Sequence, residues 1–197
     1  MILNGDVKKE ISEIISGLSR DDRTLASLTD GIKIVSFYPL LMLGSNAVIW
    51  TVFYLKAILD GDNNGQPLSF YFNAFKLIMN YGGWSSLAVT AMLGMIFILM
   101  YVTPALLWLS IPEEIRGNSK IISMMKRGFY KIGILSISLG LLLSLTGIVI
   151  DDLKLIQFSI PTVFFISMFA FTLFLTLQSA RFGLGPLMAT AKGLLRK

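Results

Sequence analysis

Residues 84–110 read WSSLAVTAMLGMIFILMYVTPALLWLS, a stretch without a single charged side chain. A helix rises about 1.5 Å per residue, so about 20 apolar residues are enough to cross a hydrocarbon layer of about 30 Å. This stretch exceeds that length, and Pro104 gives it a position where a helix can kink. It predicts a helix that spans a membrane with a tilt or a bend.

Three other stretches share this character. The predicted spans are about 34–58, 84–110, 132–150 and 158–179. Their interiors hold no Asp, Glu, Lys or Arg. The one charged residue within these bounds, Lys56, lies near the end of its span, where its ammonium can reach the interface. Of all 197 residues, 54% are hydrophobic and 15% are charged, whereas soluble domains carry about 25% charged residues. The sequence therefore predicts an all-α integral membrane protein with four transmembrane helices.

Basic residues are distributed unevenly among the segments outside the spans. The N-terminal segment, the central loop and the C-terminal tail hold most of them, and the two opposite loops hold few. The N-terminal segment has Lys8, Lys9, Arg20, Arg23 and Lys33, and the central loop has Arg116, Lys120, Lys126, Arg127 and Lys131. The tail has Arg181, Lys192, Arg196 and Lys197. The opposite side has Lys56, Lys76 and Lys154. Because cytoplasmic loops are enriched in Lys and Arg, we expect both termini and the central loop in the cytoplasm.

This topology divides the chain into three parts. Residues 1–33 form a cytoplasmic amphipathic segment, 34–180 a four-helix membrane domain with an extracytoplasmic loop at 60–83, and 181–197 a basic cytoplasmic tail. We expect the first part to form one or two short helices that lie on the membrane, dock a partner or rest on the first span. Its apolar residues at helical spacing include Ile11, Ile14, Ile15 and Leu18.

The central loop and the tail also predict amphipathic segments. In the loop, a basic helix at 119–131 is expected to lie on the inner leaflet, ahead of the third span. Contact with anionic lipid headgroups explains the net charge of +5, so no nucleic acid is expected as a partner. The predicted inner-leaflet basic residues are Lys120, Lys126, Arg127, Lys131, Arg181, Lys192, Arg196 and Lys197.

Small residues recur at helical spacing on two spans. Lipid gives helices no hydrophobic reason to associate, so close approach through small residues takes over. The predicted helix-packing residues are Ser86, Thr90 and Gly94 on the second span, and Gly133, Ser136, Gly140, Ser144 and Gly147 on the third. These stripes face either other helices of this chain or a second subunit. Asn46, an amide inside a span, is expected to bond across to another helix.

The loop at 60–83 holds two candidate sites. Asp60, Asp62 and Asn64 match the first half of a calcium-binding loop, but Tyr71 stands where the bidentate glutamate belongs. They form a weak calcium candidate, and a tight turn after a helix explains the same residues. The second site is an aromatic surface that lies in the membrane interface or docks a partner, consisting of Phe70, Tyr71, Phe72, Phe75, Tyr81 and Trp84.

The residue inventory argues against catalysis. The chain has no cysteine and no histidine, which excludes disulfides, thiolate nucleophiles, imidazole bases and the usual ligands of zinc, haem and iron–sulfur clusters. The acid pairs, including Asp151-Asp152, lie in loops, and this pair is expected to end one helix and cap the next. We expect no enzyme activity, no cofactor and no catalytic residue.

These observations favour a non-catalytic interaction or structural subunit of a bacterial inner-membrane complex, in secretion, conjugation or envelope machinery. Its expected partners are membrane lipids and other membrane proteins or further copies of the chain. Two alternatives stay open: an oligomeric channel or small transporter, and a membrane immunity protein against a pore-forming toxin, which the chain resembles in span count, orientation and size only. An Ile- and Lys-rich composition without an Asn-X-Ser/Thr sequon points to a bacterial source.

Overall fold

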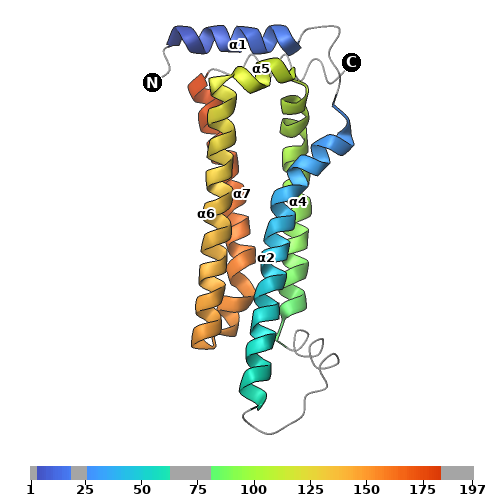
Figure 1. Ribbon diagram of the computed structural model, residues 1–197, viewed down its shortest axis with the longest axis vertical. Coiled ribbons are helices and arrows are strands. Elements are labelled where there is room, and N and C mark those ends of the chain that lie inside the picture. Colours follow the sequence, from blue (N-terminus) through green and yellow to red (C-terminus); the bar gives the residue numbers. More distant parts are fainter. Residues whose placement is uncertain (1–3, 19–25, 63–80, 183–197) are drawn as a thin grey trace. The chain divides into compact units, whose positions relative to one another are not determined.

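The computed structural model describes residues 4–18, 26–62 and 81–182. Within these ranges the chain is almost entirely helical (Figure 1). In chain order they are α1 (Asn4–Leu18), α2 (Leu28–Asp62), α4 (Gly83–Leu109), α5 (Glu113–Asn118), α6 (Lys120–Ile150) and α7 (Leu153–Phe182).

Four of these helices, α2, α4, α6 and α7, are long and apolar enough to cross a membrane. This confirms the predicted all-helical fold class with four helices of spanning length. The bounds of α4 agree with the prediction within one residue, whereas α2, α6 and α7 begin earlier than the apolar blocks do. Hydropathy marks only the part of a helix that suits hydrocarbon, and the hydrogen-bonded helix continues beyond it.

A side-chain cap fixes the early start of α2. The Ser27 hydroxyl accepts a hydrogen bond from the Asp30 backbone N–H at 3.2 Å and donates one to the Asp30 carboxylate at 2.6 Å. A serine in this place satisfies one of the N–H groups that a helix start leaves unbonded. The helix therefore begins at Leu28, ahead of the apolar block that starts near Ile34.

The structure corrects the predicted boundary at residue 132. Apart from Ser119, the basic segment predicted at 119–131 belongs with the third span to one continuous helix, α6. No proline interrupts the junction, and the glycine that follows it, Gly133, costs only about 1 kcal/mol relative to alanine. The basic side chains predicted for a separate interfacial helix are therefore carried by the first turns of a long helix.

The chain forms two compact units, each with its own buried clusters. The first comprises Met1–Val35, Leu99–Ile132 and Phe169–Lys197, and the second comprises Ser36–Ile98 and Gly133–Met168. All four long helices contribute residues to both units.

In the first unit, α1 buries its apolar side against the central segment of the chain. Ile14 is 3% exposed and clusters with Ile111 and Ile122, with Trp108 and Ile115 packed around them. In Figure 1, α1 lies alongside α5. The amphipathic helix therefore packs on the α4–α6 connection and on the start of α6.

A carboxylate from α1 also caps the start of α6. Glu10 accepts a hydrogen bond from the Ser119 hydroxyl at 3.0 Å and another from the Ile121 backbone N–H at 3.1 Å. Ser119 in turn accepts one from the Ile122 N–H at 3.2 Å. A negative charge at a helix N-terminus is stabilising, so Glu10 adds a specific polar contact to the apolar docking of α1.

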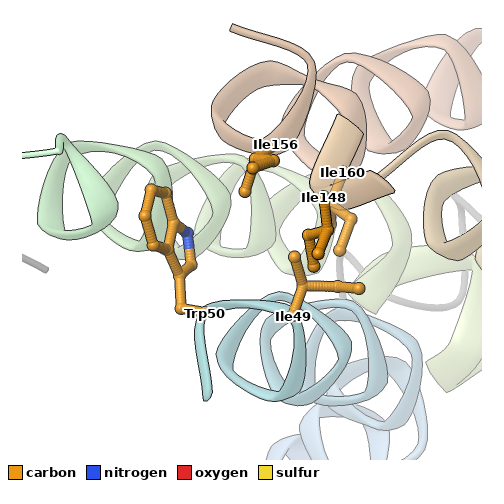
Figure 2. Close-up of a cluster of buried hydrophobic side chains, with 5 residues drawn as sticks. All are labelled: Ile49, Trp50, Ile148, Ile156 and Ile160. Carbon is orange, nitrogen blue, oxygen red and sulfur yellow. The ribbon is translucent and has the colours of Figure 1, made fainter. Parts of the chain in front are cut away.

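The second unit has an aliphatic core with one indole. Figure 2 shows the cluster, to which α2, α6 and α7 contribute. Every member is at most 6% exposed. The residues are Ile49 and Trp50 from α2, Ile148 from α6, and Ile156 and Ile160 from α7.

The turn between α6 and α7 confirms the expected role of the two aspartates. Asp151 adopts a left-handed φ of 58°, and the Asp152 N–H donates back to the Gly147 carbonyl at 2.9 Å, which closes α6. The Asp152 carboxylate then accepts hydrogen bonds from the N–H groups of Lys154 and Leu155 at 2.9 and 3.2 Å, which caps α7.

Lys56 of α2 joins this turn. Its ammonium donates to the Ile148 carbonyl at 2.7 Å and pairs with the Asp151 carboxylate at 2.5 Å. A cation at the carbonyl end of a helix is favourable. The end of α2 is thereby tied to the end of α6.

Candidate functional site

The second unit contains a buried polar network centred on Asn46, which α2 presents to α4. The side chain of Asn46 is 0% exposed, and those of Ser86 and Thr90 are 2% and 1% exposed. The Asn46 amide nitrogen donates to the Ser86 hydroxyl at 3.0 Å and to the Thr90 hydroxyl at 2.7 Å. Both amide hydrogens are thus satisfied on one neighbouring helix.

The two hydroxyls donate hydrogen bonds to backbone carbonyl groups. Thr90 donates to the Ser86 carbonyl at 2.8 Å, and Ser86 donates to the Gln157 carbonyl of α7 at 2.7 Å. A hydroxyl has one hydrogen, so the longer Ser86 contact with the Asn46 carbonyl oxygen, at 3.3 Å, competes with this bond. The Gln157 amide also donates to Ser85 at 2.8 Å, so the network joins three helices.

A second network in the same unit is centred on the phenol of Tyr38. The Tyr38 hydroxyl donates to Ser167 of α7 at 2.8 Å, and Ser167 donates to the Phe164 carbonyl at 2.7 Å. Ser136 of α6 also hydrogen-bonds to the Tyr38 hydroxyl. The Tyr38 ring packs edge-on against Phe164, with ring centroids 5.5 Å apart. One phenol therefore links α2 to α6 and α7.

The small residues of α6 face the interior of the chain. A Cβ added to Gly140 would lie 3.4 Å from the Ile160 side chain, and one added to Gly147 would lie 3.0 Å from the Ile156 backbone nitrogen. Both neighbours belong to α7, so at these two positions the stripe packs within the chain. The buried members are Gly133, Ser136, Gly140, Ser144 and Gly147.

The small residues of α4 face α2. Ser86 and Thr90 bond to Asn46, and a Cβ added to Gly94 would lie 3.1 Å from the Cβ of Pro39. Pro39 removes a backbone donor inside α2, and Gly94 gives its ring room. The two stripes thus meet two different helices of the same chain.

Two buried polar atoms of this unit have no hydrogen-bond partner among the described residues. They are the indole nitrogen of Trp50 and the hydroxyl oxygen of Ser144. Trp50 belongs to the cluster in Figure 2, where its ring lies among isoleucines. Leaving such a group unpaired costs about 1–3 kcal/mol, which the apolar contacts around it must offset.

Only part of the predicted outer surface falls within the described residues. Tyr81 and Trp84 are 44% and 46% exposed, and the Tyr81 ring meets Phe53 at 5.8 Å. Asp60 and Asp62 belong to the end of α2, but their side chains lie outside the described part of the structure, so the calcium site stays a prediction. The predicted residues outside the description are Asn64, Phe70, Tyr71, Phe72 and Phe75.

The first unit carries the charged candidates. Five of the predicted inner-leaflet basic residues are described, and all five are exposed: Lys120, Lys126, Arg127, Lys131 and Arg181. Lys192, Arg196 and Lys197 lie outside the described residues. Beside the α1 docking contact is a hollow of about 240 Å³, lined by Glu10, Glu13, Glu114, Ile115, Asn118 and Ser119.

The sequence does not single out Tyr38, Ser167 or Gln157, although each bonds between helices. Their only signal is a polar atom in or beside an apolar span. Which of these atoms meet depends on the rotation of each helix about its axis, and the small-residue stripes indicate that rotation without naming the partner.

No protein-family model, curated protein or solved structure matches this chain. Its function is therefore inferred from its own residues and their geometry.

Replacing Asn46 by alanine should weaken the second unit. Asn46→Ala removes two interhelical hydrogen bonds, and we expect the free energy of unfolding to fall by about 0.5–2 kcal/mol. Unfolding in mixed micelles, followed by tryptophan fluorescence, measures the change. Val48→Ala, at a position that is 57% exposed, is the control and should leave the free energy within about 0.5 kcal/mol. Equal effects of the two substitutions would contradict a structural role for Asn46.

Two glycine substitutions separate close packing from helix propensity. Gly147→Ala places a methyl group 3.0 Å from the backbone of α7, so it should lower the thermal midpoint in detergent. Gly44→Ala, in α2, meets nothing within 4 Å, and alanine favours a helix, so its midpoint should be unchanged or higher. A Gly147→Ala midpoint equal to that of Gly44→Ala would show that α6 and α7 do not depend on this contact.

Proposed function

We propose that this chain is inserted in a bacterial inner membrane as a four-span protein. The support is that the second unit buries polar side chains together with its apolar core, while large aliphatic side chains cover its surface. Asn46, Ser144 and Ser167 are at most 1% exposed, whereas Leu135 and Val149 are 70% and 79% exposed. Water would disfavour such long exposed apolar faces, and hydrocarbon would accept them. Buried polar groups that bond between helices suit the same environment.

Both termini and the central loop lie in the cytoplasm in this proposal. The support is the distribution of positive charge along the chain. Apart from Lys56, Lys76 and Lys154, every Lys and Arg falls in the segments that make up the first unit. Positive charge is retained on the cytoplasmic side during insertion, so the segments that carry these residues are the cytoplasmic ones.

In that membrane the chain acts as a non-catalytic interaction or structural subunit of a complex, in secretion, conjugation or envelope machinery. The observation that carries this function is that the central polar side chains of the spans bond to one another and to the backbone. Sites of transport or chemistry inside a membrane are usually marked by ionisable residues, and the span interiors hold no acidic or basic side chain. Contacts with other proteins are then left to the polar ends and the lipid-facing surface.

Cysteine labelling tests the orientation directly, because the chain has no native cysteine. Lys154→Cys and Ser12→Cys each place one thiol at an exposed position, beside the α6–α7 turn and on α1 respectively. A membrane-impermeant maleimide should label Lys154→Cys in intact spheroplasts and Ser12→Cys only after lysis. Labelling of Ser12→Cys in intact spheroplasts, or extraction of the protein by alkaline carbonate, would contradict the proposal.

Purification from native membranes tests the role as a subunit. In mild detergent, the chain should elute with a second protein at a fixed ratio that persists through a second affinity step, as measured by light scattering and mass spectrometry. Elution as a lone monomer would contradict this role. Ion conductance in liposomes would instead establish the channel alternative, and rescue of cells from one toxin by the isolated gene would establish the immunity alternative.

A further inference from the structure

The first turns of α6 present a basic face whose position is fixed by the packing of the opposite face. Phe129 stacks on Phe171 of α7 with ring centroids 5.3 Å apart, and meets Phe174 edge to face at 5.5 Å. Gly128 lies against the Phe174 ring so closely that a Cβ would overlap it. Residues 128 and 129 therefore face α7. At 100° per residue, the outward positions of these turns are 126, 127, 130 and 131.

Those four outward positions hold three cations and one aromatic ring. Lys126, Arg127 and Lys131 are exposed, and Tyr130 is 70% exposed. None of the three cations pairs with a carboxylate of the described residues. Arg127 and Lys131 are four residues apart, a spacing at which like charges repel on a helix. The face therefore carries concentrated positive charge that the described protein does not neutralise.

The same helix becomes apolar in its next turn. Ile134 and Leu135 follow Tyr130 and Lys131 by four residues each and are 47% and 70% exposed. A tyrosine between cations and aliphatic side chains is typical of the boundary between headgroups and hydrocarbon. A phospholipid suits both surfaces, because its phosphate can meet the cations while its acyl chains lie along the adjoining aliphatic side chains. The anion expected at this face is therefore a lipid phosphate.

We propose that Lys126, Arg127, Tyr130 and Lys131 form a binding face for the headgroup of an anionic phospholipid. This inference rests on the proposed membrane insertion. Arg127 and the two lysines supply charge-assisted hydrogen bonds to phosphate oxygens, and the Tyr130 ring lies at the level of the glycerol backbone. Its function is to fix the depth of α6 at the inner leaflet and to relieve the repulsion along this face.

Native mass spectrometry of the purified protein tests this face. The probes are phosphatidylglycerol and phosphatidylcholine with identical acyl chains, titrated into a neutral detergent. Wild-type protein should bind phosphatidylglycerol more tightly than phosphatidylcholine. In the variant K126Q/R127Q/K131Q, the ratio of these two affinities should fall at least about tenfold. Raised salt should lower this ratio of affinities. Inorganic phosphate at the same concentration as the lipid should not displace bound phosphatidylglycerol.

Two further variants make the result specific. K8Q/K9Q/K33Q removes three charges from exposed positions of the same unit and should keep the wild-type preference. K126R/K131R keeps the charge of the face and should also bind phosphatidylglycerol. Equal loss in the first control would overturn the proposal, because net charge alone would then explain binding, and so would wild-type binding by K126Q/R127Q/K131Q. Carbonate extraction of the wild type separates failure of this inference from failure of membrane insertion.

Discussion

The buried amide of Asn46 is the constraint on which the packing of the second unit depends. Apolar contacts alone do not select which surfaces of two apolar helices meet, so a side chain that must satisfy two donors decides the choice. Asn46 satisfies both on α4, through Ser86 and Thr90. Seven residues earlier on α2, Pro39 lies against Gly94, which follows Thr90 by four residues. The order of the two contacts along α2 is reversed along α4, as it is for antiparallel helices. Both contacts lie on one face of each helix, so together they fix the rotation of α2 against α4.

The same helix, α2, also organises α6 and α7. Its phenol at Tyr38 bonds to Ser136 and Ser167, and its ammonium at Lys56 closes the carbonyl end of α6. Between these points α6 and α7 approach each other through small residues, which allow close packing but do not fix the rotation of either helix about its axis. The directional hydrogen bonds from α2 fix that rotation. A span with almost no amphipathic character can therefore still have one defined inward face, set by a few polar atoms along its length.

The sequence predicts those parts of the fold that follow from local chemistry. The four apolar blocks and the aspartate pair that ends α6 and caps α7 follow from residue type and spacing. Spacing also indicates that Gly140 and Gly147 lie on a packing face, but it does not name the helix that they meet. The continuity of α6 does not, because hydropathy changes at residue 132 while hydrogen bonding does not. The docking of Glu10 at the start of α6 joins residues more than 100 positions apart, and no local pattern indicates it. The Tyr38 network depends on helix rotation in the same way.

The polar interior also limits where a function can be located. Hydroxyls that bond to a neighbouring carbonyl, as Ser86 and Ser167 do, are engaged in both directions and cannot receive a substrate without breaking a helix contact. In the second unit, the two buried atoms without a partner among the described residues, on Trp50 and Ser144, are enclosed by packed side chains, and enclosure without a polar counterpart is unsuited to binding a polar ligand. In the proposed function, recognition is therefore left to the ends of the helices. There, α1, α5 and the first turns of α6 bring together side chains that are distant in sequence, and the charge that the spans exclude is concentrated.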